Sequence, residues 1–161
     1  MVKKFFLLLI LMLPCIALAG EKADFVLVKK NKSKLYLIRD GNVFMEFNAV
    51  FGPNPKGHKF RRGDGRTPEG EYILDYKKAD SDFYKAIHIS YPNEKDLQRA
   101  KFLEVDPGGQ IMIHGLPNER SYLSVGSRST NWTDGCIGVT NSAMDEIWDA
   151  VEPGTPIKIT P

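Results

Sequence analysis

A cysteine and a histidine are the two residues of this chain whose types and setting suit them to do chemistry together. Cys136 stands between two glycines in the stretch 133–139, TDGCIGV, whose composition is typical of an exposed turn that enters a buried strand. His114 follows the apolar run 111–113, twenty-two positions before Cys136, so a strand can deliver its imidazole to the same pocket. A thiol and an imidazole in one pocket are the nucleophile and the base of cysteine-dependent acyl transfer.

The thiol of Cys136 needs help to act as a nucleophile. A thiol with the ordinary pKa of about 8.5 is only slightly ionised at neutral pH, so a neighbouring imidazole or aligned backbone dipoles must activate it. His114 is the candidate base. Gly135 permits a tight turn that would direct the backbone N–H groups of Gly135 and Cys136 at a developing oxyanion, where each donor is worth about 3 kcal/mol. Free cysteines are often simply buried, but the glycines and the histidine favour chemistry here.

The other two histidines are weaker candidates. His88 alternates with isoleucines in a strand-like run, so we expect it to be hydrogen-bonded inside or beside the pocket. His58 lies in a loop rich in basic residues and is predicted to be at the surface. No pair among the histidines and Cys136 has the spacing of zinc ligands such as C-x-x-C or H-x-x-x-H. The sequence therefore predicts no metal site.

The first nineteen residues read as an export signal. Two lysines precede an apolar run, and Ala17-Leu18-Ala19 offers a cleavage site of the A-x-A type before Gly20. The run is shorter than the roughly 18 to 20 apolar residues that a membrane span needs, and Pro14 disfavours lipidation at Cys15. We expect residues 1–19 to be a signal peptide and residues 20–161 to form one exported domain, with no stable membrane span after cleavage.

Charge argues against a nucleic-acid partner. The whole chain carries 22 basic and 20 acidic side chains, and removal of residues 1–19 takes away two lysines and no acid. The mature chain is therefore neutral, whereas proteins that bind polyanions are usually basic. Cys136 is also the only cysteine left after cleavage, so it has no partner for an intramolecular disulfide.

The remaining sequence predicts a mostly β domain with two short helices. Asp40-Gly41 is a hairpin signal, because a type I′ turn needs positive φ at both central positions. An acidic start and a basic end suit the helix dipole over 94–103, and apolar spacing predicts a second helix that begins with Asn141 as its N-cap. A proline- and glycine-rich basic loop covers 52–70, and a long loop covers 115–134. The predicted strands are 25–27, 35–38, 43–51, 71–76, 86–91, 110–114 and a closing edge strand, 157–159.

Several of these stretches resemble the YkuD-type L,D-transpeptidase catalytic domain. His114-Gly115 followed by Thr133-x-Gly135-Cys136-Ile137 is similar to the family's pattern of His-Gly and then Ser/Thr-His-Gly-Cys-Ile/Val-Arg. The stretch 63–72, GDGRTPEGEY, resembles its Thr-Pro-x-Gly segment, and 88–93, HISYPN, is similar to a run found in one periplasmic branch. The resemblance covers about residues 25–159. Two positions depart from the commoner pattern, because Asp134 replaces a histidine and Gly138 replaces an arginine.

The resemblance implies a β-sandwich-like YkuD fold, catalysis by Cys136 and His114, and no cofactor. In the family a backbone carbonyl often fixes the histidine tautomer, and Gly115 or the residues after it are the nearest choices. Arg66 is the favoured substrate-binding member of the basic loop, because it adjoins Thr67-Pro68, although such a loop can also simply face solvent. The implied role of three further residues is to contact substrate or to orient the site: Thr133, Asp134 and His88.

The implied substrate is a peptidoglycan stem peptide in the periplasm or cell envelope. Cys136 would form a thioester, and an amine from a second stem would resolve it to give a crosslink in cell wall organisation. If water resolves it, the protein is instead an L,D-endopeptidase or carboxypeptidase, including one that releases a wall-anchored outer-membrane lipoprotein. The departures at Asp134 and Gly138 lean toward that hydrolytic branch. The alternative without catalysis is a peptidoglycan-binding module.

Overall fold

The computed structural model describes residues 20–118 and 131–161. The expected signal segment, 1–19, and most of the long loop, at 119–130, lie outside the described residues. Strands dominate the described chain, as the sequence predicts, and two α-helices and one short 3-10 helix accompany them. In chain order the elements are β1 (Phe25–Lys29), η1 (Lys30–Lys32), β2 (Lys34–Arg39), β3 (Asn42–Asn48), β4 (Gly70–Lys78), β5 (Ala86–Ile89), α1 (Glu94–Phe102), β6 (Met112–His114), β7 (Ile137–Gly138), α2 (Asn141–Ala150) and β8 (Thr155–Thr160).

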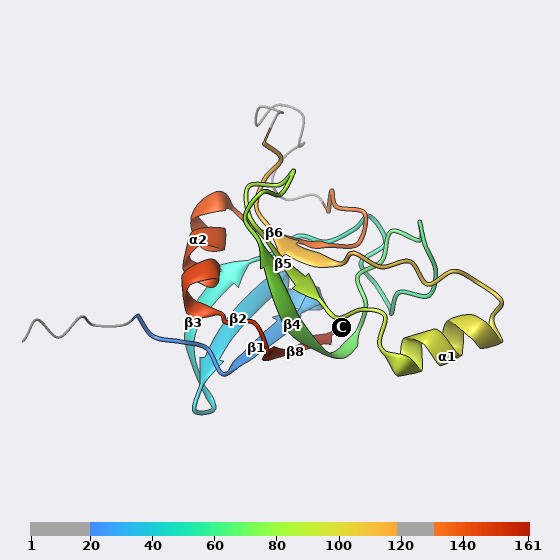
Figure 1. Cartoon of the computed structure of the whole chain (residues 1–161), viewed down its shortest axis with the longest axis horizontal. Coiled ribbons are helices and arrows are strands. Elements are labelled where there is room, and N and C mark those ends of the chain that lie inside the picture. The colour runs from blue at the N-terminus through green and yellow to red at the C-terminus, as the bar shows by residue number, and fades with distance from the viewer. Residues whose placement is uncertain (1–19, 119–130) are drawn as a thin grey trace, which may run out of the picture.

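The strands form one curled sheet in the order β3-β2-β1-β8-β4-β5-β6-β7. The two ends of this order approach each other, because Val50, just after β3, exchanges two backbone hydrogen bonds of 2.9 Å with Gly138 in β7. The sheet therefore nearly closes on itself, and Figure 1 shows β5 and β6 in front of the strands β1 to β3. This arrangement confirms the mostly β, sandwich-like fold with two short helices.

The N-terminal strands form the expected antiparallel meander. β1 pairs with β2, and β2 pairs with β3, both antiparallel. Asp40 and Gly41 at the second turn have φ of 50° and 76°, which are the positive values that a type I′ turn requires. The local turn signal in the sequence was sufficient to locate this hairpin.

The C-terminal strand is central, and the prediction of a closing edge strand is wrong. β8 runs parallel to β1 on one side and antiparallel to β4 on the other. Ile157 and Ile159 are each 1% exposed, as is typical of a strand with neighbours on both sides. This strand joins the N-terminal meander to the half of the sheet that carries Cys136 and His114.

The two helices occupy different settings. α2 packs Met144 and Ile147 into the core, and its N-cap is Thr140, whose hydroxyl accepts a hydrogen bond from Ala143 N. The expected N-cap, Asn141, is instead the first helical residue. α1 lies away from the sheet in Figure 1, and Asn93 and Asp96 close a capping box at its start. Over residues 20–118 and 131–161, neither helix has the length and apolar character of a membrane span.

Candidate active site

Cys136, in the turn just before β7, and His114, in β6, lie at the same end of the sheet. β6 and β7 are parallel, with Ile113 opposite Ile137 and His114 opposite Gly138. Side chains two residues apart along an extended chain lie on the same face. Cys136 is two residues before Gly138, the partner of His114, so its side chain is expected on the same face of the sheet as that of His114. Within the described chain the thiol makes no hydrogen bond to the imidazole, and its sulfur lies 3.6 Å from the Gln110 carbonyl oxygen. Catalytic hydrogen bonds commonly tighten only when substrate binds.

His114 is held in one tautomer by a backbone carbonyl. Its Nδ1 lies 2.7 Å from the Gly115 oxygen, and since a carbonyl only accepts, Nδ1 carries the proton and Nε2 keeps its lone pair. This contact identifies Gly115 among the carbonyls that the sequence left open.

Aromatic side chains enclose the imidazole of His114. Phe83 and Trp132 lie with ring centroids 4.4 and 5.6 Å from its own, and His114 is only 3% exposed. Burial lowers the pKa of His114, although the Gly115 contact opposes the shift. The imidazole is therefore neutral at pH 7 and able to accept a proton. Neither aromatic neighbour was singled out from the sequence, because Phe83 is 31 positions away from His114.

The Cys136 thiol is not preionised. Burial raises its pKa and the Asp134 carboxylate adds to the rise, while the Met112 backbone and the Lys59 ammonium act in the opposite direction. A protonated thiol needs a general base to act as a nucleophile. The directions of these two pKa shifts therefore favour a neutral thiol and a neutral imidazole over a resting thiolate–imidazolium pair.

Thr133 organises the turn that carries Cys136. Its side chain is buried, and its hydroxyl donates to the Cys136 carbonyl at 2.7 Å and accepts from Gly135 N at 3.3 Å. Gly135 has φ of 128°, and a Cβ there would come 2.5 Å from the Arg66 oxygen, so only glycine fits. Of the two backbone donors expected to form an oxyanion hole, Gly135 N–H is engaged by Thr133. Cys136 N–H has no hydrogen-bond partner among the described residues.

Cys136 opens into a cavity of about 530 Å³ between the 52–70 loop and the turn before β6. Asp134 lines it and is exposed. The cavity also contains two cations that the sequence did not favour, Lys59 and Arg62, together with several backbone-rich positions. The full lining is Pro53, Asn54, Lys59, Arg62, Gly63, Gly65, Gly108, Gly109, Gln110, Ile111, Asp134 and Cys136.

Arg66 does not line this cavity. Its guanidinium lies over the Phe60 ring, 5.8 Å from the centroid, and its Nη1 comes within 2.8 Å of the place that a Cβ on Gly57 would occupy. Adjacency to Thr67 in sequence was a poor guide, because successive side chains of an irregular loop point in different directions.

His88, Thr133 and the proposed base His114 also lie outside the cavity lining. His88 Nδ1 is 2.7 Å from Asp75 Oδ1, and its ring stacks on Tyr76 with centroids 4.5 Å apart. It stands in β5 opposite Met112, and Asp75 is the hydrogen-bond partner that the sequence led us to expect for it.

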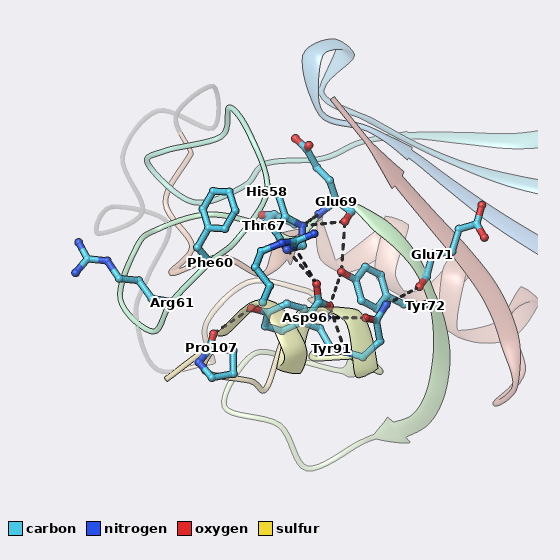
Figure 2. A network of polar contacts seen from close by, with 12 residues as sticks. His58, Phe60, Arg61, Thr67, Glu69, Glu71, Tyr72, Tyr91, Asp96 and Pro107 are labelled. Atoms are coloured by element: carbon cyan, nitrogen blue, oxygen red, sulfur yellow. Dashed lines mark hydrogen bonds and ion pairs between the residues drawn. The ribbon is translucent and has the colours of Figure 1, made fainter. Parts of the chain in front are cut away.

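A buried polar network joins the 52–70 loop to β4 and α1 (Figure 2). His58 Nε2 lies 3.0 Å from Asp96 Oδ1, and its Nδ1 lies 3.1 Å from the Glu69 N–H and 2.9 Å from the Glu69 oxygen. Tyr72 donates to the other Asp96 oxygen at 2.9 Å. The prediction that His58 is at the surface is wrong, because its side chain is only 13% exposed. The network also joins the two family-like stretches, 63–72 and 88–93, through the capping box of Asn93 and Asp96.

The environment of Gly138 explains the absence of an arginine there. A Cβ at this position would lie 2.9 Å from Val50, 3.1 Å from Trp132 and 3.2 Å from Thr133. Trp132 therefore takes part of the space that a longer side chain would need. Among the described residues, no group of three or more metal-ligating side chains is found.

The comparisons with known proteins match this arrangement. The family model described as "L,D-transpeptidase catalytic domain", YkuD, matches residues 23–159. The Escherichia coli K12 protein named "Putative L,D-transpeptidase YafK" is 32% identical over 135 residues, which are 78% of this chain and 45% of that protein. The chain therefore spans less than half the length of this curated relative.

Two solved structures are similar over most of the described fold. The helical cell shape determining protein Pgp2 from Campylobacter jejuni has a TM-score of 0.63 and 28% identity, covering 84% of this chain and 46% of that one. Bd1075 from Bdellovibrio bacteriovorus has a TM-score of 0.59 and 25% identity, covering 84% and 47%. A Xylanimonas cellulosilytica L,D-transpeptidase, at 19% identity and a TM-score of 0.58, shares the fold.

Proposed function

Since the chain belongs to the family of YkuD-type L,D-transpeptidase catalytic domains, we propose that it is a cysteine-dependent peptidoglycan L,D-transpeptidase. Its substrates are peptidoglycan stem peptides, and its place is the periplasm or cell envelope after removal of residues 1–19. Catalysis uses Cys136 as the nucleophile and His114 as the base, with no cofactor.

The observation that carries this proposal is the 2.7 Å hydrogen bond from His114 Nδ1 to the Gly115 carbonyl. It leaves Nε2 unprotonated on the strand beside Cys136, as a general base requires. The lowered pKa of His114 and the raised pKa of Cys136 support the same assignment, because the proton then rests on sulfur until substrate arrives.

In the proposed reaction, Cys136 sulfur attacks the carbonyl of the third stem residue while His114 Nε2 takes the thiol proton. The Cys136 N–H donates to the developing oxyanion. The C–N bond to the following D-residue then breaks, the imidazolium returns its proton to the leaving amine, and a thioester remains. The amine of a second stem attacks this thioester, restores the thiol and forms the 3-3 crosslink.

Other proposed contributions come from residues around the turn. Thr133 holds the turn in shape through its hydroxyl, and Asp134 contacts substrate from the cavity wall. His88 supports the site from β5, where Asp75 fixes its ring. Arg66 is absent from the cavity lining, so its proposed role is to hold the loop and not to bind substrate.

Hydrolysis of the same thioester by water is the alternative. It would make the protein an endopeptidase or carboxypeptidase, with release of a wall-anchored lipoprotein as one outcome. The departures from the family's commoner residues at Asp134 and Gly138 lean toward this alternative.

The test is to incubate the mature protein with purified sacculi, in parallel with Cys136→Ala, and to identify muropeptides by mass spectrometry. New 3-3 dimers support transpeptidation. Shortened stems or freed lipoprotein fragments without new crosslinks support hydrolysis instead. Products identical to those of Cys136→Ala would overturn both reactions and leave a peptidoglycan-binding module.

A further inference from the structure

The cavity beside Cys136 has an asymmetric charge. Asp134, two positions before Cys136, lines it, and so do two cations of the 52–70 loop, Lys59 and Arg62. A peptide substrate that ends in a free carboxylate is repelled by Asp134 and attracted by the two cations. The question is which of the two cations is available to a ligand.

Lys59 is already engaged within the protein. It is 3% exposed, and its ammonium donates to Asp64 Oδ1 at 2.9 Å and to the Arg61 oxygen at 3.0 Å. The Asp64 carboxylate also accepts three backbone N–H bonds, from Phe60, Arg61 and Arg66. Lys59 therefore completes a hydrogen-bond network that fixes the conformation of the loop. It has little capacity left to bind a ligand.

Arg62 is positioned but not saturated. Its Nε lies 2.7 Å from Asp106 Oδ2, and its backbone N–H donates to the Asp106 oxygen at 2.7 Å. Asp106 is itself fixed by Gly108 N at 2.8 Å. A guanidinium has five N–H donors, and in the described part of the chain Nε is the donor of this side chain that finds a protein acceptor. Its side chain is 73% exposed.

The surroundings of Arg62 leave room for a ligand. Gly63, Gly108 and Gly109 line the cavity around it, and a Cβ on Gly108 would come 3.3 Å from the Arg62 Cα. The absence of side chains at these positions leaves the cavity open beside Arg62. The terminal amino groups of arginine suit a carboxylate because they can donate two parallel hydrogen bonds.

We propose that Arg62 binds the free C-terminal carboxylate of the donor stem peptide, in the cavity that it shares with Cys136. Asp106 orients the guanidinium, and Asp134 disfavours the reverse direction of the peptide. This site selects donors that have a free C-terminal carboxylate close to the scissile bond over donors in which that terminus is a carboxamide. The inference rests on the proposed function, because it names the substrate group that the Cys136 site reads.

The test compares two stem tetrapeptides of identical sequence, one with a free C-terminal carboxylate and one with a carboxamide. Thioester formation is followed by intact mass, and kcat/KM is measured for each peptide. Wild type is expected to prefer the carboxylate by about tenfold or more, as for a charge-assisted pair. Arg62→Gln should lose most of that preference through KM.

Arg61→Gln is the matched control, because Arg61 is exposed in the same loop but does not line the cavity. It should keep the wild-type preference. A second measurement uses wild type alone: raising the salt from about 0.05 M to about 1 M should reduce the preference, since exposed charge pairs are screened. A preference that survives both Arg62→Gln and high salt overturns the inference.

The two failures are distinguishable. If wild type forms no thioester with either peptide, and behaves as Cys136→Ala does, the proposed function fails. If wild type forms the thioester but shows no preference for the carboxylate, or if Arg61→Gln loses it as fully as Arg62→Gln, the reaction stands and the assignment of Arg62 fails.

Discussion

His114 and His58 are both largely enclosed by protein, but they differ in the contacts of their ring nitrogens. His114 uses one ring nitrogen to reach the Gly115 carbonyl, and among the described residues its Nε2 has no hydrogen-bond partner. His58 has contacts at both nitrogens, to Asp96 on one side and to Glu69 on the other. The free nitrogen of His114 suits it to accept a proton, whereas the contacts of His58 suit it to hold the 52–70 loop against α1.

The contacts of His58 join separate parts of the chain. Its Nδ1 lies 3.1 Å from Glu69 N, and its Nε2 lies 3.0 Å from Asp96 Oδ1 in α1. The proposed catalytic pair and this network thus divide chemistry from support.

The sharpest test of this division replaces each of the two histidines by glutamine in a separate variant. His114→Gln should lower kcat/KM about 10² to 10⁴-fold, because the general base is lost. His58→Gln should leave kcat/KM within about tenfold of wild type but should reduce the free energy of unfolding by about 1 to 3 kcal/mol. Urea unfolding and steady-state kinetics on both variants measure this. Equal losses of activity in the two variants would contradict the division.

Removal of the carboxylate at the centre of the network should have the next largest effect. Asp96→Ala leaves buried donors of His58 and Tyr72 unsatisfied, and we expect a loss of about 2 to 4 kcal/mol in the free energy of unfolding. Lys95→Ala is the control, because Lys95 is exposed on the same helix. The idea of a supporting network fails if both variants unfold at the same urea concentration.

Substitution of Gly138 tests whether the catalytic end of the sheet tolerates a side chain. Gly138→Ala places a Cβ 2.9 Å from Val50, so we expect overpacking to cost about 1 to 3 kcal/mol. Gly138→Arg, which restores the commoner residue of the family, should be at least as destabilising and should not raise kcat/KM. Thermal unfolding of both variants is the measurement, and an arginine variant with wild-type stability and higher activity would refute it.

The acid dependence of stability should show the smallest effect. Burial alone would raise the pKa of Asp96, but hydrogen bonds from His58, Asn93 N and Tyr72 outweigh burial and hold the pKa below its ordinary value. The carboxylate therefore stabilises the fold above its unfolded pKa of about 4, and this contribution disappears as the pH falls through the lower folded value. Unfolding free energies below about pH 4 should fall more steeply for wild type than for Asp96→Asn. Equal slopes would exclude this role.

Local sequence signals were sufficient where the physics is local. The hairpin follows from the dipeptide Asp40-Gly41, whose residues adopt positive φ, and α1 follows from its acidic start and basic end. The apolar run 111–113 located the strand that carries His114. Each of these signals acts between residues a few positions apart, so a single sequence contains it.

The residues around the reactive pair needed the tertiary structure. Loop residues 59, 62 and 66 have the same charge and nearly the same neighbours in sequence, and only the fold decides which of them lines the cavity. His58 looked like a surface residue because its partner Asp96 is 38 positions away. The contacts that enclose His114 likewise come from Phe83 and Trp132, on separate segments.

The sequence by itself therefore determined the chemistry available to this protein: the thiol of Cys136, the imidazole of His114, the glycines of the turn and most of the strands and helices. Only the tertiary structure decided which groups the pair meets, because pairing energies between distant segments depend on the whole sheet. β8 illustrates this, since its apolar alternation suits an edge or a centre equally. Its place between β1 and β4 depends on backbone pairing with two strands that are distant in sequence.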